Sequence, residues 1–396
     1  MKILYFGSIF SSDSDFPLVK KLREKGHQVK FVMPISYQYK KGGLIDIEPF
    51  RKTGIYKACS YKQMGAYQDY LDLEQTYFIN QTDFRMRNIM TVLIWIKFYL
   101  MMLLWNPDIL HVAWPLGKMS RILYLLPAKK VLMVHDPFKH SSNTSITQER
   151  DRVYAFKRFD KLVLLNQIQK SEFCSYYKIP STKIMINKMG YFDYMEMLKV
   201  KSHIEKPYVL FFGYIVSYKG LEYLCQAMLE VHKKFPKLKL VIAGGGKIYF
   251  DYEPYKNLDY FILKNQYIPV DELSQLLRDC EFAVCPYKDA TQSGVVQTAF
   301  SLNVPMIVTN VGALPESVVN GVTGLVIPPH SVQDIANSIC DLYNNREKLE
   351  TMRKNIRNIW RKNMDWNTIT DKYIGVYNNL LAELKNRLKI SIFLWR

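Results

Sequence analysis

The sequence is poor in the features that mark secreted and metal-binding proteins. Its six cysteines form no CxxC pair and no zinc-type spacing, a pattern typical of reduced thiols in a cytosolic protein. The amino-terminal segment MKILYFGSIF lacks the apolar core and small-residue cleavage site of a secretory leader. We therefore expect a cytoplasmic protein without structural disulfides.

Acidic residues are also scarce, because 36 Asp and Glu stand against 54 Lys and Arg, giving a formal charge of +18. Such an excess favours anionic partners, namely phosphates, acidic lipid surfaces or nucleic acid, and does not choose among them. No helix-turn-helix, zinc or RNA-binding sheet motif is present, so we expect no nucleic-acid partner.

No apolar run reaches the roughly 20 residues that a membrane-spanning helix needs. The longest run, residues 89–105, is interrupted by Lys97 and predicts a buried or interface-lying helix. Arg85, Arg87 and the basic, aromatic segments 37–43, 50–62 and 389–396 could form either a solvated basic face or a surface for an anionic membrane. We keep both alternatives, the second as a possible location at the inner face of the plasma membrane.

Strand-like and helix-like segments alternate along the whole chain, which predicts an α/β protein with parallel sheets wound by helices. A length of 396 residues fits two such domains, with a polar linker near residues 198–207. The expected strands are KILYFGSI, VKFVM, DILHVAW, KVLMVHD and KLVLLN in the first half, and YVLFFGYI, LKLVIAGGG, DYFIL, FAVCPY and PMIVTNV in the second.

Several helix boundaries can also be predicted. Asp15 precedes Phe16-Pro17 as an expected N-cap, and Gly26 ends that helix. Ser331 and Asp334 form a capping box, and an apolar face follows Lys219-Gly220 through Leu221, Leu224, Cys225 and Met228. Because Asp15 reads as a cap, the Asp-x-Asp of SDSDF is not expected to bind a metal.

Turns rich in Gly, Ser and Thr follow three strands of the second half, around residues 213–220, 291–295 and 310–316. Strands of a parallel sheet end at one edge, where backbone N–H groups at helix starts bind anions. Lys219, directly before a helix, could neutralise a diphosphate leaving group there. The alternatives are ordinary strand-turn-helix connections and a solvated lysine.

These blocks resemble the group 1 (family 4) glycosyltransferases, most closely from residue 208 to 329. The matching segments are VLFFGYIVSYKGLEYL, LVIAGGG, NQYIPVDELSQLL, CPYKDATQSGVVQTAFSLNVPMIVTNVGALPE and NGVTGLVIPP. The resemblance implies a GT-B architecture, in which two Rossmann-like doubly wound domains face each other across a cleft. It also implies a metal-independent, cofactor-independent transfer of sugar from a UDP- or GDP-linked donor with retention of configuration.

On this basis we expect an acceptor-binding domain over residues 1–200, a nucleotide-sugar-binding domain over 201–370, and a terminal helix over 371–396 that packs back on the first domain. The resemblance implies catalytic roles for His135, Lys219 and Glu316. The residues expected to bind the donor are Gly7, Gly213, Tyr214, Tyr267, Thr291, Gln292, Ser293, Gly294, Val295, Thr298 and Gly312.

The sequence departs from the family at charged positions. Two glutamates that members usually carry are Ala290 and Thr298 here, and a common arginine is Tyr214. The expected function is addition of a sugar to a glycan or lipid-linked acceptor in cell-surface polysaccharide synthesis. The alternative is a nucleotide-binding or scaffold subunit whose catalysis has weakened with those replacements.

Overall fold

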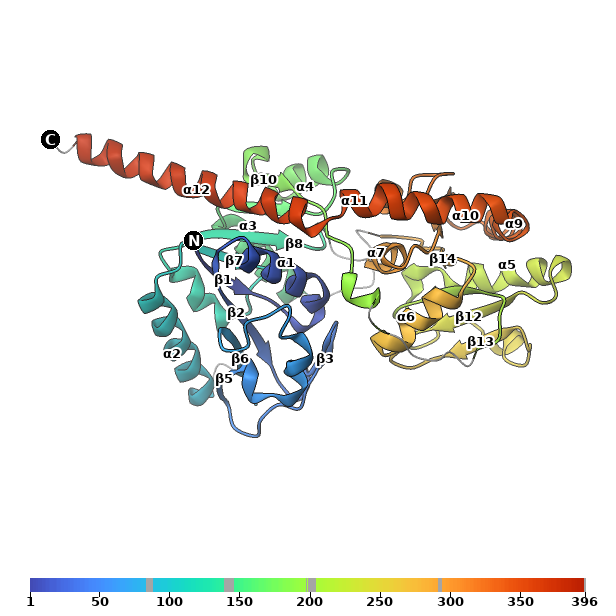
Figure 1. Ribbon diagram of the computed structural model, residues 1–396, viewed down its shortest axis with the longest axis horizontal. Coiled ribbons are helices and arrows are strands. Elements are labelled where there is room, and N and C mark those ends of the chain that lie inside the picture. The colour runs from blue at the N-terminus through green and yellow to red at the C-terminus, as the bar shows by residue number, and fades with distance from the viewer. Residues whose placement is uncertain (83–87, 139–145, 197, 199–203, 291–293, 395–396) are drawn as a thin grey trace. The chain divides into compact units, whose positions relative to one another are not determined.

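The computed structural model describes the chain apart from residues 83–87, 139–145, 197, 199–203, 291–293 and 395–396 (Figure 1). The described chain divides into two compact units. Unit 1 contains Met1–Pro137, Ser145–Met189 and Trp366–Arg396, and unit 2 contains Phe138 together with Gly190–Asp365. Half of the expected linker, residues 199–203 of 198–207, lies outside the described residues.

Unit 1 is built on an eight-stranded sheet in the order β10-β9-β8-β7-β1-β2-β6-β5, parallel except for the β5–β6 pair. The chain starts in the middle of this sheet, at β1, and winds first to one side and then to the other. The strands are β1 (Lys2–Phe6), β2 (Gln28–Ile35), β5 (Gly54–Lys57), β6 (Thr76–Asn80), β7 (Ile109–Val112), β8 (Lys129–Val134), β9 (Lys161–Leu164) and β10 (Ile184–Ile186). The short strands β3 (Lys41–Gly42) and β4 (Ile45–Asp46) pair separately.

The helices of unit 1 include α12, the last element of the chain. The others are α1 (Ser12–Glu24), α2 (Ile89–Trp105), α3 (Ile146–Arg158) and α4 (Lys170–Tyr177), and α12 covers Trp366–Leu394. α12 packs on α1 and β8 (Figure 1). A hydrogen bond of 2.6 Å joins Tyr377 Oη of α12 to Nδ1 of the buried His111 on β7. Lys25 of unit 1 forms an ion pair with Asp371 of α12 at 2.8 Å.

The predicted cap of the first helix was wrong. α1 begins at Ser12 with Ser11 in the capping position, so Asp15 lies inside the first turn. Its carboxylate is fully buried and accepts hydrogen bonds from Tyr5 Oη at 2.8 Å and Ser11 Oγ at 2.7 Å. Asp15 ties α1 to β1, and this long-range contact cannot be read from local sequence.

Unit 2 has a six-stranded, fully parallel sheet in the order β13-β12-β11-β14-β15-β16. Its strands are β11 (Tyr208–Phe212), β12 (Lys239–Ala243), β13 (Phe261–Lys264), β14 (Ala283–Cys285), β15 (Met306–Thr309) and β16 (Gly324–Ile327). Its helices are α5 (Leu221–Lys234), α6 (Val270–Asp279), α7 (Gly294–Ser301), α8 (Leu314–Ser317), α9 (Val332–Asn344), α10 (Arg346–Asn355) and α11 (Arg361–Asn363).

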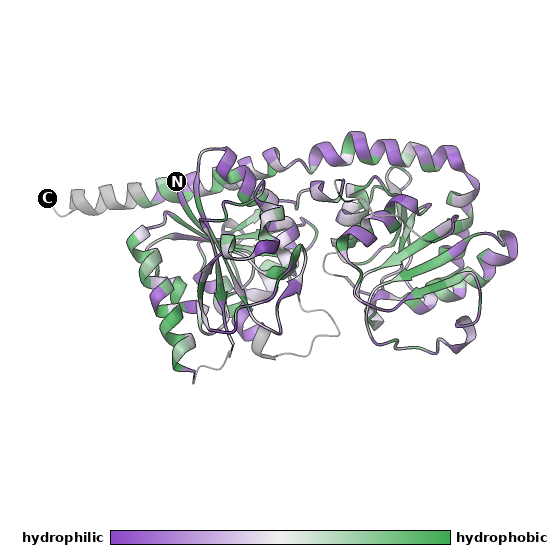
Figure 2. Ribbon diagram, turned by 60° about the horizontal axis from the view of Figure 1, so that its bottom comes forward, coloured by the Kyte–Doolittle hydropathy of each residue, from purple (hydrophilic) through white to green (hydrophobic). Residues whose placement is uncertain are grey.

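The core of unit 2 lies between the sheet and the α5–α9 pair. Leu221, Leu224, Cys225 and Met228 are buried on one face of α5, as the spacing predicts. Ser331 Oγ accepts the Asp334 N–H at 3.1 Å and caps α9, which confirms that boundary. Because strands such as Val209–Phe212 are buried on both faces, the sheet appears almost continuously apolar in Figure 2.

All ten expected strands are present, and the sequence analysis missed β3, β4, β5, β6, β10 and β16. The six cysteines are free thiols, although Cys59 is exposed. Residues 89–105 form α2, and no helix in the described part of the chain is long and apolar enough to cross a bilayer.

Candidate functional site

The topology of unit 2 places a switch point, where the strand order reverses direction, at the carboxyl ends of β11 and β14. β11 lies between β12 and β14, so the chain leaves it toward one side of the sheet and later returns to the other. Loops at such a switch point diverge and leave room for a ligand. The predicted turns around residues 213–220 and 310–316 follow β11 and β15 and therefore lie at this edge, whereas residues 291–293 of the third turn lie outside the described residues.

Glycines bring these turns into close contact. Gly244 has a φ of +159°, and a Cβ there would lie 2.0 Å from the carbonyl oxygen of Gly213. Gly312 has a φ of +53°, and a Cβ there would lie 1.6 Å from the carbonyl oxygen of Ala290. The turn after β12 thus packs against the turn after β11, and the turn after β15 packs against the loop after β14. Only glycine permits both approaches.

Lys219 is buried beside this edge. It ends a single helical turn over Ser217–Lys219 and has 6% of its surface exposed. A Cβ on Gly213 would lie 2.8 Å from Lys219 Nζ, so the ammonium lies directly over the end of β11. Its Nζ is 5.3 Å from the centre of the Tyr287 ring, and it makes no ion pair with any residue that the structure describes.

The electrostatics of Lys219 follow from this position. Burial lowers the pKa of its ammonium to about 8, and Cys285 on β14 partly opposes the shift. A buried cation without a carboxylate partner is costly, and such groups cluster at functional sites. A phosphate next to Lys219 would supply the missing anion.

A second lysine in the same region has a different environment. Lys288 pairs with Glu222 of α5 at 2.7 Å, and Glu222 also accepts a hydrogen bond from Tyr249. Tyr249 Oη in turn accepts the Leu221 N–H at 2.9 Å. This network fixes the start of α5 to the loop after β14, and so holds Lys219 in place.

The remaining predicted donor residues of unit 2 surround the same edge or lie outside the described residues. Val295 of α7 is close to Gly213, since a Cβ on that glycine would lie 3.8 Å from Val295 Cγ2. Glu316 is half-buried on α8. Tyr214 and Tyr267 follow β11 and β13 and are 64% and 55% exposed. Gly294 begins α7, whereas Thr291, Gln292 and Ser293 lie outside the described residues.

Two of the three positions that depart from the family pattern, Ala290 and Thr298, have structural roles of their own. Ala290 is buried, and its carbonyl oxygen contacts Gly312. Thr298 Oγ1 donates to the carbonyl oxygen of Gly294 at 2.7 Å, so its proton is used within α7. The hydroxyl oxygen of Thr298 can still accept a hydrogen bond from a ribose hydroxyl, but such a bond is weaker than one to a carboxylate.

Unit 1 has its own cavity at the switch point between β1 and β7. The cavity measures about 430 Å³, and its lining includes Gly7 and Ser8 after β1 and Trp114 and Pro115 after β7. Trp95 of α2 closes one side. A Cβ on Gly7 would lie 2.6 Å from both Asp15 Oδ2 and the Phe31 ring, so packing inside unit 1 already requires this glycine.

His135 lies next to that cavity, at the end of β8. Its ring stacks on Trp114 with centroids 4.9 Å apart and planes 3° apart. Its Nε2 atom is buried and has no hydrogen-bond partner among the described residues. Burial lowers the pKa of His135 to about 4, with Asp136 opposing the shift, so the imidazole is neutral at pH 7.

Sequence reasoning missed Trp114, Trp95 and Tyr287. Trp114 lies two residues beyond the end of β7, so the rule that places ligands beyond strand ends could have identified it. Trp95 and Tyr287 gave no such signal, because Trp95 belongs to the apolar run of residues 89–105 and Tyr287 to an expected strand. No three His, Cys, Asp or Glu side chains in the described part of the chain gather as metal ligands.

Comparison with known proteins gives one family and several relatives. Residues 206–345 match the family model described as Glycosyl transferases group 1. An uncharacterized glycosyltransferase of Methanocaldococcus jannaschii is 27% identical over 56% of this chain and 66% of its own length. The alpha-D-kanosaminyltransferase of Streptomyces kanamyceticus is 22% identical over 44% of this chain and 46% of its own. The matches thus span between about half and two thirds of these relatives.

The solved structures show the same fold over nearly the whole chain. HepE of Anabaena, in complex with UDP, has a TM-score of 0.67 and 14% identity, covering 96% of this chain and 100% of that one. Sucrose-phosphate synthase of Thermosynechococcus elongatus also has a TM-score of 0.67, with 14% identity over 97% of this chain. The fold is that of the GT-B glycosyltransferases.

Proposed function

The chain carries a group 1 glycosyltransferase domain over residues 206–345 within a GT-B fold, and from this premise we propose that it transfers a sugar from a UDP- or GDP-linked donor. The acceptor is a glycan or lipid-linked sugar used in cell-surface polysaccharide synthesis, and the reaction is retaining and metal-independent. The enzyme works in the cytoplasm.

One observation carries the proposal: Lys219 is a buried cation without an ion-pair partner in the described part of the chain, next to closely packed glycine turns. The site is therefore charged to receive an anion, and a diphosphate supplies negative charge at two neighbouring positions. Negative charge grows on the diphosphate as the sugar leaves, so Lys219 would stabilise the transition state more than the ground state.

In this mechanism Gly213, Gly294 and Gly312 let backbone N–H groups approach the phosphate oxygens, and Glu316 binds hydroxyl groups of the donor sugar. His135 orients the transferred sugar, a role that a neutral imidazole can fill as donor or acceptor. The departing phosphate takes the acceptor's proton on the same face of the sugar. The apolar cavity with Trp114 and Trp95 would receive the acceptor, since aromatic rings pack well on sugar and lipid.

The test begins with binding. Purified protein is screened by thermal shift and calorimetry against UDP, GDP, ADP and CMP, and then against sugar conjugates of the nucleotide that binds. The proposal expects selective stabilisation by one nucleoside diphosphate and turnover of its conjugate, unaffected by EDTA, with an α-linked donor giving an α-linked product. Binding by none of them would contradict it.

A second candidate function is a nucleotide-binding or scaffold subunit with weakened catalysis. It is favoured by one observation, the use of the Thr298 proton inside α7 at a position where relatives of this type carry a carboxylate. It predicts that the protein binds a nucleoside diphosphate but neither hydrolyses nor transfers from any of its sugar conjugates. Turnover that Lys219→Ala abolishes would exclude it.

A further inference from the structure

Helix α2 presents an apolar face to solvent along its whole length. Its buried face consists of Thr91, Ile94, Trp95, Phe98 and Met102. At 100° per residue the opposite face forms a single stripe. The stripe residues, between 37% and 88% exposed, are Ile89, Met90, Leu93, Ile96, Leu100, Leu103 and Leu104. Figure 2 shows α2 as a mostly green helix on the outside of unit 1.

A patch of this kind is unusual on a protein surface. Single exposed leucines need no explanation, but a contiguous apolar stripe marks a surface that binds another protein or a membrane. Leu125, which is 67% exposed, lies on the turn Ser120–Leu125 that packs against α2.

The charge carried by α2 itself has one sign. α2 contains no acidic residue, and its Lys97 is exposed at the edge of the stripe. At the carboxyl end of α2, Lys30 Nζ lies 4.9 Å from the centre of the Trp105 ring, and Lys2 Nζ donates to the Trp105 carbonyl oxygen at 3.1 Å. Trp105 thus joins the apolar stripe to a group of ammonium ions.

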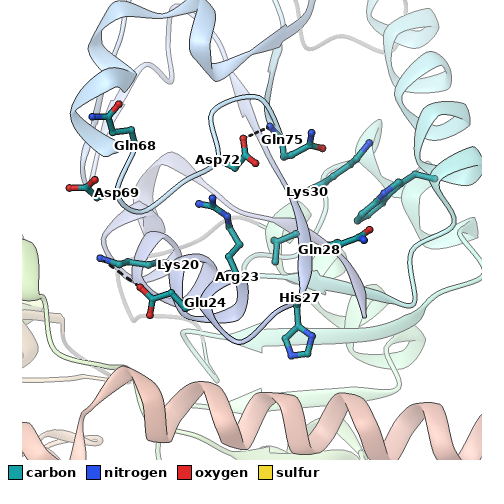
Figure 3. Close-up of a pocket in the computed structure, with 12 residues that line it drawn as sticks. Lys20, Arg23, Glu24, His27, Gln28, Lys30, Gln68, Asp69, Asp72 and Gln75 are labelled. Atoms are coloured by element: carbon teal, nitrogen blue, oxygen red, sulfur yellow. Dashed lines mark hydrogen bonds and ion pairs between the residues drawn. The ribbon is translucent and has the colours of Figure 1, made fainter.

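The same tryptophan lines a cavity of about 640 Å³ at the amino ends of the strands (Figure 3). Arg23 projects from α1 into this space, and Arg23 and Lys30 form no ion pair with any described residue. Of the carboxylates in the lining, Glu24 pairs with Lys21 at 2.6 Å and Asp72 accepts backbone N–H groups. Asp69 is the third carboxylate of the lining.

We propose that α2 lies flat on an anionic phospholipid surface, with its stripe at the boundary of headgroups and acyl chains and with Arg23 and Lys30 facing a lipid phosphate. A helix with an apolar face, lysines at its border and Trp105 at its end has the composition of an interfacial helix. Its 17 residues give about 25 Å of length, which suits a helix lying in the plane of a leaflet.

Charge favours a lipid surface over a second copy of this chain. A two-fold pairing of stripes would bring lysines from both copies together, and α2 offers no carboxylate to neutralise them. An anionic leaflet supplies that counter-charge everywhere along the helix. This inference does not rest on the proposed glycosyl transfer, because it concerns a different face and is measured without donor or acceptor.

The test is flotation of the full chain with vesicles of phosphatidylcholine alone or mixed with phosphatidylglycerol. We expect binding to the mixed vesicles that salt weakens. Leu93→Ser combined with Leu100→Ser should reduce that binding at least about tenfold, because binding scales with buried apolar area. Lys30→Gln should reduce it by about fivefold, the effect of one lysine near an anionic surface.

The matched control is Val319→Ser combined with Ile359→Ser, which removes two apolar side chains of 55% and 50% exposure from unit 2. It should bind vesicles as the wild type does. Equal binding by the α2 variant would overturn the proposal. So would a dimer in sedimentation experiments that the α2 variant dissociates, without vesicle binding by the wild type. In a last arm, inorganic phosphate is added to the flotation mixture. If it abolishes the part of vesicle binding that Lys30→Gln removes, the cavity binds free phosphate and its lipid role is overturned.

Discussion

Replacing Lys219 by methionine should stabilise the unliganded protein while weakening its binding of nucleoside diphosphates. The two effects have one cause, the burial of an ammonium ion that no carboxylate in the described part of the chain neutralises. Methionine keeps most of the side-chain volume and removes the charge. A residue that served only the fold would not show these opposite effects.

The size of the stability change follows from the pKa of Lys219, which burial lowers from 10.5 to about 8. This difference corresponds to about 3 kcal/mol of cost for keeping the charge in the folded state. Loss of the Tyr287 ring contact offsets about 1 kcal/mol, leaving a gain of about 2 kcal/mol at pH 7.

The same reasoning fixes the pH dependence. Below pH 8 both the folded and unfolded states hold the proton, so the full cost is present. Above pH 8 the folded state releases the proton first, and the cost fades as the pH approaches 10.5. The stabilisation by Lys219→Met should therefore shrink between pH 7 and pH 9. Diphosphate affinity should fall about tenfold to a hundredfold, the usual loss for a hydrogen bond to a charged group.

The assays are urea unfolding at both pH values and calorimetry with the nucleoside diphosphate that binds the wild type. Lys288→Met is the matched control, because Lys288 is paired with Glu222 and its removal should destabilise the protein by up to about 1 kcal/mol. The reasoning fails if Lys219→Met unfolds at the wild-type urea concentration or below and binds the diphosphate with wild-type affinity.

Three further predictions concern unfolding and binding. Burial raises the pKa of Asp15 to about 7, so the folded state keeps a proton that the unfolded state loses above about pH 4. The free energy of unfolding should therefore fall as the pH rises from about 4 to about 7. Asp15→Asn should reduce that fall, as measured by urea unfolding across this pH range. Gly312→Ala should cost about 2 kcal/mol because of its positive φ and the Ala290 oxygen, whereas Gly375→Ala, in open space within α12, should stabilise by about 0.5–1 kcal/mol in thermal unfolding. Thr298→Glu should tighten nucleoside diphosphate binding about tenfold by calorimetry if that position contacts the ribose, and unchanged affinity would remove it from the site.

Ten strands and some helix boundaries were predictable because they depend on local patterns. Ser331 caps α9 through an atom three residues away, and the face of α5 follows from helical spacing. Asp15 shows the limit of such reasoning, because its partners Tyr5 and Ser11 belong to a strand and a different turn. The strand β5 was missed because it pairs antiparallel at the sheet edge and carries a weak apolar pattern.

The candidate site was predictable as a set of turns but not as a set of environments. The rule on strand ends was enough to select Gly213, Lys219 and Gly312, and Gly213 and Lys219 lie together. Nothing in the amino-acid sequence distinguishes Lys219 from Lys288. Lys219 is buried without an ion-pair partner among the described residues, whereas Lys288 is paired with Glu222. That difference depends on residues distant in sequence and needs coordinates.

The return of α12 to unit 1 affects the order in which the chain can fold as it is synthesised. All the strands of unit 2 lie within the stretch Gly190–Asp365, and they have emerged before α12 begins. Unit 1 at that moment still lacks the helix that contributes Tyr377 to His111 and Asp371 to Lys25. The part of the protein that is made first is therefore completed last, and until then the face of its sheet that α12 covers stays open to water and to chaperones.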